Sequence, residues 1–269
     1  MDTISLLILG IVQGLTEFLP VSSTGHLIVA RVFLGIPEVN GLAVDAVLQL
    51  ATALAVIVYF RSDIVRLASS ALAFLSGRRG GDEYMVFALL MGTVPALVIG
   101  LMLEGTMETV FRSAELVAYT LLVGSVIMLF AEFYSKKFAS KTSVEAMTWQ
   151  KGLAIGLFQA LALIPGMSRS GMTISGGLFL GFTREAAARF GFLLSVPIIF
   201  GSGLKKLLEL GASGTLVQME FALMVGVIAS FVSGLLAIHA LLLFVRTQPM
   251  YVFIVYRVII AAVILFLPI

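Results

Sequence analysis

The chain of 269 residues contains no cysteine, one tryptophan and two histidines. The absence of cysteine excludes disulfides, zinc–thiolate sites and a cysteine nucleophile. Charged residues make up only 12% of the chain, about half the share that is usual in soluble domains. Lysine and arginine form no basic tail or patch, so we expect no nucleic-acid partner.

Apolar residues fill the chain instead. They make up 60% of it, and the mean hydropathy is +1.11. These values exclude a soluble globular domain, a disordered chain and a fibrous protein, and they are typical of a polytopic helical membrane protein. The first apolar run already contains Gln13 and Glu17, and Asp2 stands where a signal peptide has basic residues. We therefore expect this segment to be retained rather than cleaved.

Six segments are apolar enough to cross a bilayer, which takes about 20 residues of helix. These segments lie near 45–61, 84–103, 115–134, 186–204, 218–245 and 250–268. Two further apolar regions, near 4–36 and 151–181, are interrupted by Pro20 and Pro165, each followed by small polar residues. Proline disfavours helix at the residue before it. Each region is therefore predicted to be two half-helices that meet at a polar loop.

Lysine and arginine predict which loops face the cytoplasm. The loops 61–83 and 135–151 each carry four of them, and Arg246 lies between the last two spans. We place these three regions inside and the loop 104–114 outside, which puts both termini outside. Residues 205–206, two lysines, then fall outside as well, against the rule.

This topology makes the two interrupted regions enter the membrane from opposite sides, each followed by three full spans. Such an arrangement is an inverted repeat, with its site where the broken elements meet near the midplane. At an offset of 145 residues, Pro20 aligns with Pro165 and Ser23 with Ser168. The predicted fold is an all-α polytopic membrane protein, a single integral membrane domain with pseudo-repeats at about 1–135 and 150–269.

The first interrupted region contains a carboxylate in an apolar setting. Gln13 and Glu17 are four residues apart and share a helix face. A buried carboxylate is costly and usually meets a cavity, a partner or an ion. Glu17 stands three residues before Pro20, which favours a functional role over a side chain that merely reaches the membrane surface.

A small polar run, Ser22-Ser23-Thr24-Gly25-His26, follows. At the start of a helix, such residues offer hydroxyl and backbone donors to an anion. His26 lies three residues after Ser23, so it could activate that hydroxyl or act on phosphorus directly. A simple helix cap with a structural histidine is the alternative.

The second region contains Ser168, Arg169, Ser170 and Thr173. A guanidinium at membrane depth stays charged and binds phosphate or carboxylate with two hydrogen bonds. Arg169 is therefore predicted to bind a phosphate. The alternative is an ion pair between Arg169 and Glu17 that joins the two halves.

Together the two clusters suit an anionic phosphate group, and the carboxylate could also bind a hard divalent cation such as Mg²⁺ or Ca²⁺. Gln13 and Glu17 alone are too few ligands, so substrate and water would complete the shell. Asp45 is expected to cap the 45–61 helix, and His239 to be packed or interfacial. Close helix contacts are predicted at Gly92, Gly100, Gly226 and Gly234.

These motifs resemble the undecaprenyl-pyrophosphate phosphatase family, the bacitracin resistance proteins of bacterial inner membranes. One motif is the (Glu/Gln)-x-x-x-Glu pattern of residues 13–17, followed by the run to His26. The other is Pro-Gly-x-Ser-Arg-Ser-x-x-Thr at residues 165–173. The resemblance covers essentially the whole chain. It implies a membrane phosphatase that converts undecaprenyl pyrophosphate to undecaprenyl phosphate, the lipid carrier for peptidoglycan and other envelope polymers.

The resemblance also implies roles for individual residues. The catalytic centre would consist of Glu17, Ser23, His26 and Arg169. Glu17 would also bind the divalent cation. Ser168 and Thr173 would bind the pyrophosphate together with Arg169. From the polar clusters themselves, we also expect Gln13, Ser22, Thr24 and Ser170 to bind the substrate. Residue 13 is Gln here where some members have Glu, so a two-carboxylate metal site is not expected.

Several points stay open at this level. The nucleophile could be Ser23 assisted by His26, which we favour, or His26 itself, or water activated by Glu17 or His26. The expected partners are the polyprenyl pyrophosphate and membrane lipids, with a homodimer as an open alternative to a monomer. We expect the active site to face the periplasm. A transporter or flippase of a polyprenyl phosphate lipid is the competing function, because inverted repeats are common in transporters.

Overall fold

The computed structural model describes residues 2–36, 41–78, 81–109, 113–138, 142–212 and 215–266, and these form helices with no strand apart from one isolated bridge between Thr142 and Phe182. The helices are α1 (Thr3–Phe18), α2 (Ser23–Leu34), α3 (Gly41–Tyr59), α4 (Arg61–Leu75), α5 (Glu83–Thr109), α6 (Ala114–Phe138), the short 3₁₀ turn η2 (Val144–Ala146), α7 (Trp149–Leu161), α8 (Arg169–Phe179), α9 (Arg184–Ala212), α10 (Thr215–Thr247) and α11 (Tyr251–Phe266). The predicted all-α fold is confirmed for this part of the chain.

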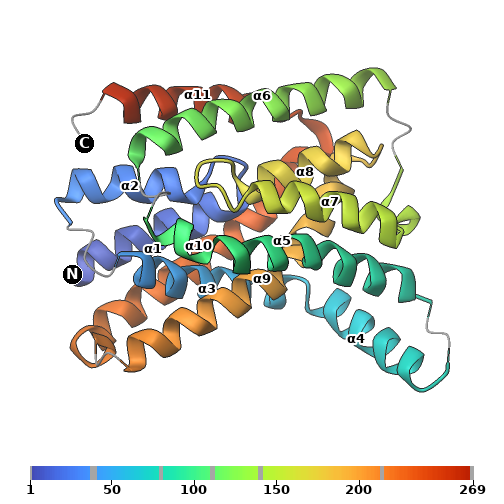
Figure 1. Ribbon diagram of the computed structural model, residues 1–269, viewed down its shortest axis with the longest axis horizontal. Coiled ribbons are helices and arrows are strands. Elements are labelled where there is room, and N and C mark those ends of the chain that lie inside the picture. Colours follow the sequence, from blue (N-terminus) through green and yellow to red (C-terminus); the bar gives the residue numbers. More distant parts are fainter. Residues whose placement is uncertain are drawn as a thin grey trace.

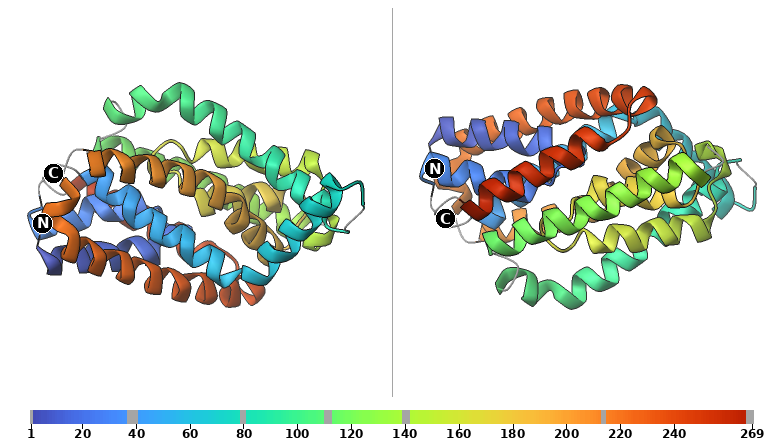
Figure 2. Two further views of the ribbon diagram at one scale, coloured as in Figure 1. Left: turned by 90° about the horizontal axis from the view of Figure 1, so that it is seen from below. Right: turned by 90° about the horizontal axis from the view of Figure 1, so that it is seen from above.

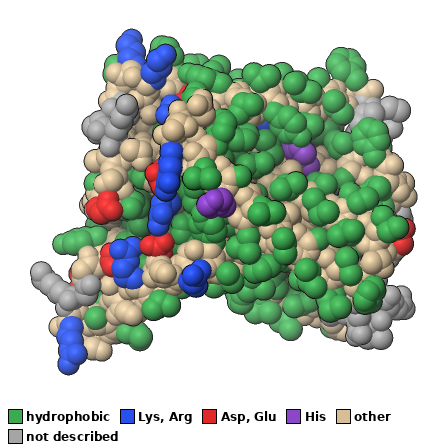
Figure 3. Space-filling view, turned by 180° about the vertical axis from the view of Figure 1, so that it is seen from behind, with side chains coloured by type: hydrophobic (Ala, Val, Ile, Leu, Met, Phe, Trp, Pro, Cys, Tyr) green, Lys and Arg blue, Asp and Glu red, His purple; other side chains and the backbone are tan. Residues whose placement is uncertain are grey.

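Most helices run along the long axis of the molecule, and both chain ends lie at the same end of it (Figure 1). The start of α6 and the end of α5 lie at that end too, whereas the end of α6, the start of α7 and the far end of α4 lie at the other. Lysine and arginine side chains gather at the latter end, next to a broad apolar face (Figure 3). The loops predicted to share a side of the membrane therefore lie at the same end of the molecule. The compartment that each end faces stays a prediction.

Four of the six predicted spans are single helices long and apolar enough to cross a membrane, namely α5, α6, α9 and α10. The span predicted at 45–61 is the helix α3, which bends by 80° into α4. The stretch 61–83, predicted as a loop, is therefore mostly helix. Its charged residues, among them Arg61, Asp63 and Arg66, keep α4 from continuing the span. The last predicted span, near 250–268, is α11 in the described residues, a shorter apolar helix of 16 residues.

The two interrupted regions form helical hairpins, as predicted. Helices α1 and α2 are separated by residues 19–22, and α7 and α8 by residues 162–168. The hairpins enter from opposite ends of the molecule and turn near its middle, where the two loops lie next to each other (Figures 1 and 2). This is the arrangement expected of an inverted repeat.

The internal equivalence of the hairpins differs by one residue from the predicted offset of 145. Ser22 and Ser168 both precede the second helix of a hairpin, and both have a positive φ, 74° and 71°. They are 146 residues apart, so Pro20 is equivalent to Gly166 rather than to Pro165. The two prolines are therefore displaced by one residue in the repeat.

The same offset of 146 residues relates Gly10 and Gly156, the hairpin glycines at two close helix crossings. A Cβ added to Gly10 of α1 would collide with the carbonyl oxygen of Gly226 in α10, and one added to Gly156 of α7 with that of Gly92 in α5. Each hairpin therefore packs, backbone to backbone, on a long helix from the other half of the chain. The close contacts predicted at Gly92 and Gly226 are confirmed.

The close contact predicted at Gly234 is also confirmed, since a Cβ added to Gly14 of α1 would lie 2.7 Å from the Gly234 backbone nitrogen. Gly100 has only ordinary contacts. Asp45 is not a helix cap, because α3 begins at Gly41; its carboxylate forms an ion pair with Arg31 of α2 instead. His239 is exposed, and its Nδ1 lies 3.0 Å from the hydroxyl of Tyr59, in agreement with an interfacial position.

Candidate active site

Glu17 lies in the last turn of α1, just before the chain leaves the helix at Leu19, whose backbone is extended. Pro20 causes this end, because proline disfavours helix at the preceding residue. The Glu17 side chain is 3% exposed. Its Oε2 accepts hydrogen bonds of 2.8 Å from Gln13 Nε2 and from Ser23 Oγ. The carboxylate is therefore held in place from its own helix and from the start of α2.

Arg169 is the first residue of α8, next to the capping residue Ser168. Its Nη2 forms an ion pair with Glu17, so the interaction considered as the alternative to phosphate binding is present. The Arg169 Nη1 is buried and has no hydrogen-bond partner among the described residues. An unpaired buried donor is costly. The guanidinium therefore has a second nitrogen available for a ligand.

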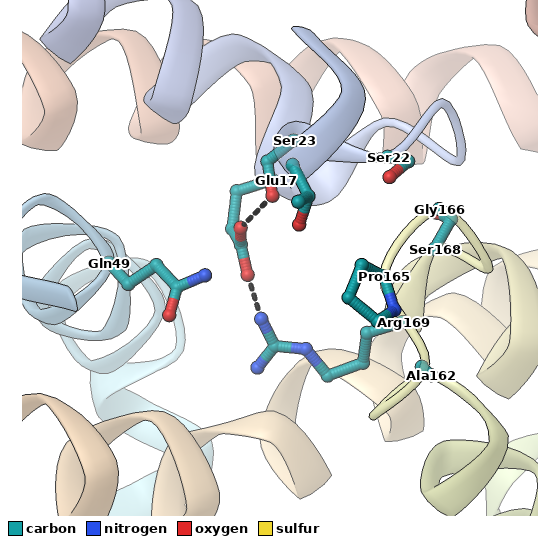
Figure 4. Close-up of a pocket in the computed structure, with 10 residues that line it drawn as sticks. Glu17, Ser22, Ser23, Gln49, Ala162, Pro165, Gly166, Ser168 and Arg169 are labelled. Carbon is teal, nitrogen blue, oxygen red and sulfur yellow. Dashed lines mark hydrogen bonds and ion pairs between the residues drawn. The ribbon is translucent and has the colours of Figure 1, made fainter. Parts of the chain in front are cut away.

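A cavity of about 70 Å³ opens beside this pair (Figure 4). It is lined by Glu17, Ser22, Ser23, Thr24, Gln49, Ala162, Pro165, Gly166, Ser168 and Arg169. The first turns of α2 and α8 both contribute to this wall. Helix N-termini carry partial positive charge and free N–H groups, so the wall combines hydroxyls, helix starts and a guanidinium. This combination suits a phosphate group.

The structure brings six of the ten predicted site residues to the cavity and leaves four outside its lining. Gln13 is fully buried behind Glu17. Thr173 donates to the carbonyl oxygen of Arg169 at 3.0 Å, within its own helix. Ser170 donates to the carbonyl oxygen of Leu19 at 3.0 Å and so joins the two loops. Ser170 and Thr173 are therefore placed to support the loops that form the cavity wall, whereas Gln13 lies behind Glu17.

His26 does not pair with Ser23 in this structure. Its Nδ1 lies 2.7 Å from the carbonyl oxygen of Ser22, and its Nε2 lies 2.9 Å from the hydroxyl of Tyr256 in α11. The rings of His26 and Tyr256 are stacked, with centroids 5.4 Å apart. The base that contacts the Ser23 hydroxyl is Glu17 instead.

Gln49 of α3 lines the cavity and was missed by the motif analysis. Its carboxamide points towards Glu17 and Arg169 (Figure 4). A glutamine inside a span of apolar residues is the sequence signal that could have identified it, because polar groups in membrane segments usually face a cavity or a partner.

The described residues contain no group of three or more His, Cys, Asp or Glu side chains that could hold a metal ion. A divalent cation therefore has one carboxylate, Glu17, and the amide oxygen of Gln13 to bind. That oxygen is buried and unpartnered within the described part of the chain. Oxygen ligands suit Mg²⁺ and Ca²⁺, so the residues fit a cation whose other ligands come from substrate and water.

Comparison with known proteins identifies the family. The model of the bacitracin resistance protein BacA matches residues 6–263. The chain belongs to the BacA family. An undecaprenyl-diphosphatase of Chloroherpeton thalassium is 41% identical, with 98% of this chain and 96% of the relative covered. One from Mycobacterium sp. (strain KMS) is 43% identical, with 99% and 97% covered.

A third relative, the undecaprenyl-diphosphatase of Thermobifida fusca, is 42% identical over 98% of this chain and 90% of its own length. The resemblance inferred from the two motifs is thus confirmed. In this BacA-family chain, the two motifs are the two hairpin loops that surround the cavity.

Proposed function

We propose that this protein is a membrane phosphatase that hydrolyses undecaprenyl diphosphate to undecaprenyl phosphate and inorganic phosphate. The observation that carries the proposal is the cavity between the loops, where Arg169 has an unpartnered buried nitrogen opposite a hydroxyl already bonded to a carboxylate. The names of the relatives point to the same reaction.

Arg169 binds the diphosphate in this scheme. The phosphate oxygens carry more negative charge than the Glu17 carboxylate, so they compete with Glu17 for the guanidinium. Nη1 is already available to them. Arginine binds phosphate with two hydrogen bonds, and the low dielectric of a buried site strengthens this attraction. Substrate binding thereby releases one oxygen of Glu17 from its ion pair.

Glu17 then acts as the base for Ser23. The two side chains are already in hydrogen-bond contact at 2.8 Å, the geometry expected of a nucleophile and its base. The Ser23 oxygen forms a bond to the terminal phosphorus, and the bond from that phosphorus to the bridging oxygen breaks. Undecaprenyl phosphate leaves, and water then hydrolyses the phosphoserine. Glu17 accepts the serine proton and returns it to the leaving phosphate.

A divalent cation fits the proposal through Glu17 and Gln13. When bound, it supplies positive charge that offsets the charge of the diphosphate. We expect EDTA to abolish phosphate release by the purified protein, and Mg²⁺ or Ca²⁺ to restore it. Full turnover in the presence of EDTA, after extensive dialysis, would remove the cation from the scheme.

The deciding experiment measures inorganic phosphate released from undecaprenyl diphosphate by the purified protein in detergent, where no second compartment exists. A phosphatase releases phosphate there, whereas a transporter only binds the lipid. Ser23→Ala is expected to lose nearly all turnover, and labelled phosphate should be trapped on Ser23 after acid quenching. Near-normal turnover of Ser23→Ala would leave water activated by Glu17 as the nucleophile.

We further place this reaction in the bacterial inner membrane, with the cavity reached from the periplasmic side. The first hairpin starts at the end of the molecule that holds both termini (Figure 1), and the basic side chains gather at the other end (Figure 3). Basic residues favour the cytoplasmic side. The released carrier lipid would then serve envelope polymers such as peptidoglycan, which fits the family's association with bacitracin resistance.

A further inference from the structure

Arg257 lies in the middle of α11, in a run of apolar residues, and is completely buried. Neither sequence motif contains it. No carboxylate of the described residues lies within ion-pair distance of its guanidinium. A buried cation without an acidic partner is costly and, in a membrane segment, usually marks a functional site. This residue therefore needs an explanation other than an ion pair.

The Arg257 guanidinium joins three segments of the chain. Its Nε donates to Ser125 Oγ at 3.0 Å, and its Nη2 donates to the carbonyl oxygens of Leu121 and Gly166, both at 3.0 Å. Ser125 and Leu121 belong to α6, whereas Gly166 belongs to the loop between α7 and α8. Arg257 thus connects α11 and α6 to the loop that carries Arg169.

Gly166 is the point through which this connection reaches the cavity. It lines the cavity three residues before Arg169 and has a φ of 93°, a conformation that favours glycine. The preceding carbonyl, that of Pro165, accepts a hydrogen bond from Thr120 of α6. Two consecutive carbonyls of the loop are therefore held from outside the hairpin, one of them by a full positive charge.

The neighbouring residue of α11 contacts the other motif. The Tyr256 hydroxyl lies 2.9 Å from His26 Nε2. Adjacent residues of one helix therefore contact both hairpins, Tyr256 the first and Arg257 the second. The Arg257 Nη1 is also buried without a hydrogen-bond partner in the described residues. An anion in the cavity, against the same loop, would provide the countercharge that the protein itself does not.

We infer that Arg257 is a positioning residue for phosphoryl transfer: it holds the Gly166 carbonyl, thereby fixes the start of α8 and Arg169, and adds a second positive charge behind the phosphate site. This inference rests on the proposed phosphatase function. A purely structural tie between α11 and α6 is the competing explanation, and it predicts lower stability with unchanged kinetics of the folded protein.

The test compares Arg257→Gln and Arg257→Lys with the wild type in detergent. We measure kcat, KM, inhibition by inorganic phosphate or vanadate, and thermal stability. Displacing a catalytic group by about 1 Å can cost 100-fold in rate, so Arg257→Gln should lose about 100-fold in kcat/KM and bind vanadate about 10-fold more weakly. Arg257→Lys should recover part of both, because it restores the charge.

Arg184→Gln is the matched control. Arg184 donates two hydrogen bonds to the fully buried Glu132, at 2.8 and 2.5 Å, and is not part of the cavity wall. This variant should lose stability but keep the KM and the vanadate inhibition of the wild type. Equal kinetics of Arg257→Gln and Arg184→Gln would overturn the inference.

Gly124→Ala tests the contact between Arg257 and the Gly166 carbonyl without removing a charge. It is the decisive variant for the positioning role if Arg257→Gln does not fold. A Cβ at position 124 of α6 would collide with Arg257 Nη2 and lie 2.9 Å from the carbonyl oxygen of Met167. We expect lower kcat/KM and weaker vanadate inhibition. Unchanged values in this variant would refute the positioning role.

The failure of this inference can be distinguished from that of the proposed function. If the wild type releases no phosphate, the proposed function fails, and vanadate-induced thermal stabilisation is then measured for the same variants. Stabilisation of the wild type that Arg257→Gln loses would still support Arg257 as part of an anion site. Equal stabilisation of both proteins would overturn it.

Discussion

Glu17 and Arg169 approach the cavity from opposite halves of the chain, and their positions are not equivalent in the repeat. At the offset of 146 residues, Glu17 corresponds to Leu163 and Arg169 to Ser23. The acid is thus present only in the first hairpin and the guanidinium only in the second. The two hairpins share a backbone plan but have different chemistry, so the site exists only where both meet.

The motifs allowed these residues to be predicted because each is a charge in an apolar run, which is seldom kept without a role. The same reasoning applies to the charge of Arg257 and, because polar groups in membrane segments are also costly, to Gln49. Both stand outside the motifs and were missed. The pairing of Ser23 with Glu17 rather than with His26 could not be predicted. It depends on the turn between α1 and α2, which sets the direction of each side chain.

Arg169→Ala is expected to lower kcat by about 10²–10³-fold, the usual cost of removing a preorganised electrostatic group. Arg169→Lys should recover little of this loss, because an ammonium cannot bind phosphate with two parallel hydrogen bonds. Phosphate release by the purified variants measures the effect. Arg246→Ala serves as the control, since Arg246 pairs with Glu185 at an exposed position. Retention of half the activity by Arg169→Ala would exclude the phosphate role.

Ser22 has a backbone conformation that is rare for any residue other than glycine, with φ 74° and ψ 105°. Such strain costs on the order of 1 kcal/mol or more and tends to occur at functional sites. Ser22→Gly should therefore be more stable than Ser22→Ala by about 1 kcal/mol, although both lack the hydroxyl. Thermal unfolding in detergent measures the difference. Equal loss of activity in both variants would assign a role to the hydroxyl itself.

At the scale of the elements, the two hairpins are held by glycine crossings. Gly10 and Gly156 are equivalent in the repeat, and each lets its helix contact a backbone carbonyl of the other half. Small residues allow this close approach between membrane helices. The hairpins were predictable because Pro20 and Pro165 are each followed by small polar residues. Pro95 and Pro197, which are followed by apolar residues, lie inside the helices α5 and α9 instead. The bend between α3 and α4 was not predictable, since no proline or glycine marks it and only the charges of α4 distinguish it from a span.

Gly156→Ala should lower the stability of the protein by about 1–3 kcal/mol, the usual cost of an overpacked contact, because the new Cβ would meet the Gly92 carbonyl. Thermal unfolding in detergent provides the measurement. Gly201→Ala is the matched control in another membrane helix, since nothing lies within 4 Å of its added Cβ. Equal stability of the two variants would show that the α5–α7 crossing tolerates a larger residue.

At the scale of the whole molecule, the hairpins enter from opposite ends, and the basic side chains are concentrated at one of them (Figures 1 and 3). Counting lysine and arginine residues was sufficient to predict which loops lie together at the basic end, because the distribution of basic residues can be read without knowing how the helices pack. The exact repeat register needed the structure. Equivalent residues could be recognised only from the matching backbone angles of Ser22 and Ser168.

The natural absence of cysteine makes the topology directly testable with Ser113→Cys and Ser143→Cys. Both serines are exposed; Ser113 precedes α6 at the end with the termini, and Ser143 precedes η2 at the opposite end. A membrane-impermeant maleimide applied to intact cells should label the first variant, and should label the second only after permeabilisation. The wild type is the unlabelled control. Labelling of both variants in intact cells would refute the proposed orientation.

The crossing of α1 with α10 has a consequence for the order in which the protein is made. Helix α10 begins 197 residues after α1 ends, which corresponds to roughly 10–40 s of translation at typical rates of 5–20 residues per second. The first hairpin, with its acidic side chain, must therefore wait in the translocon or the bilayer for most of synthesis before its packing partner emerges from the ribosome.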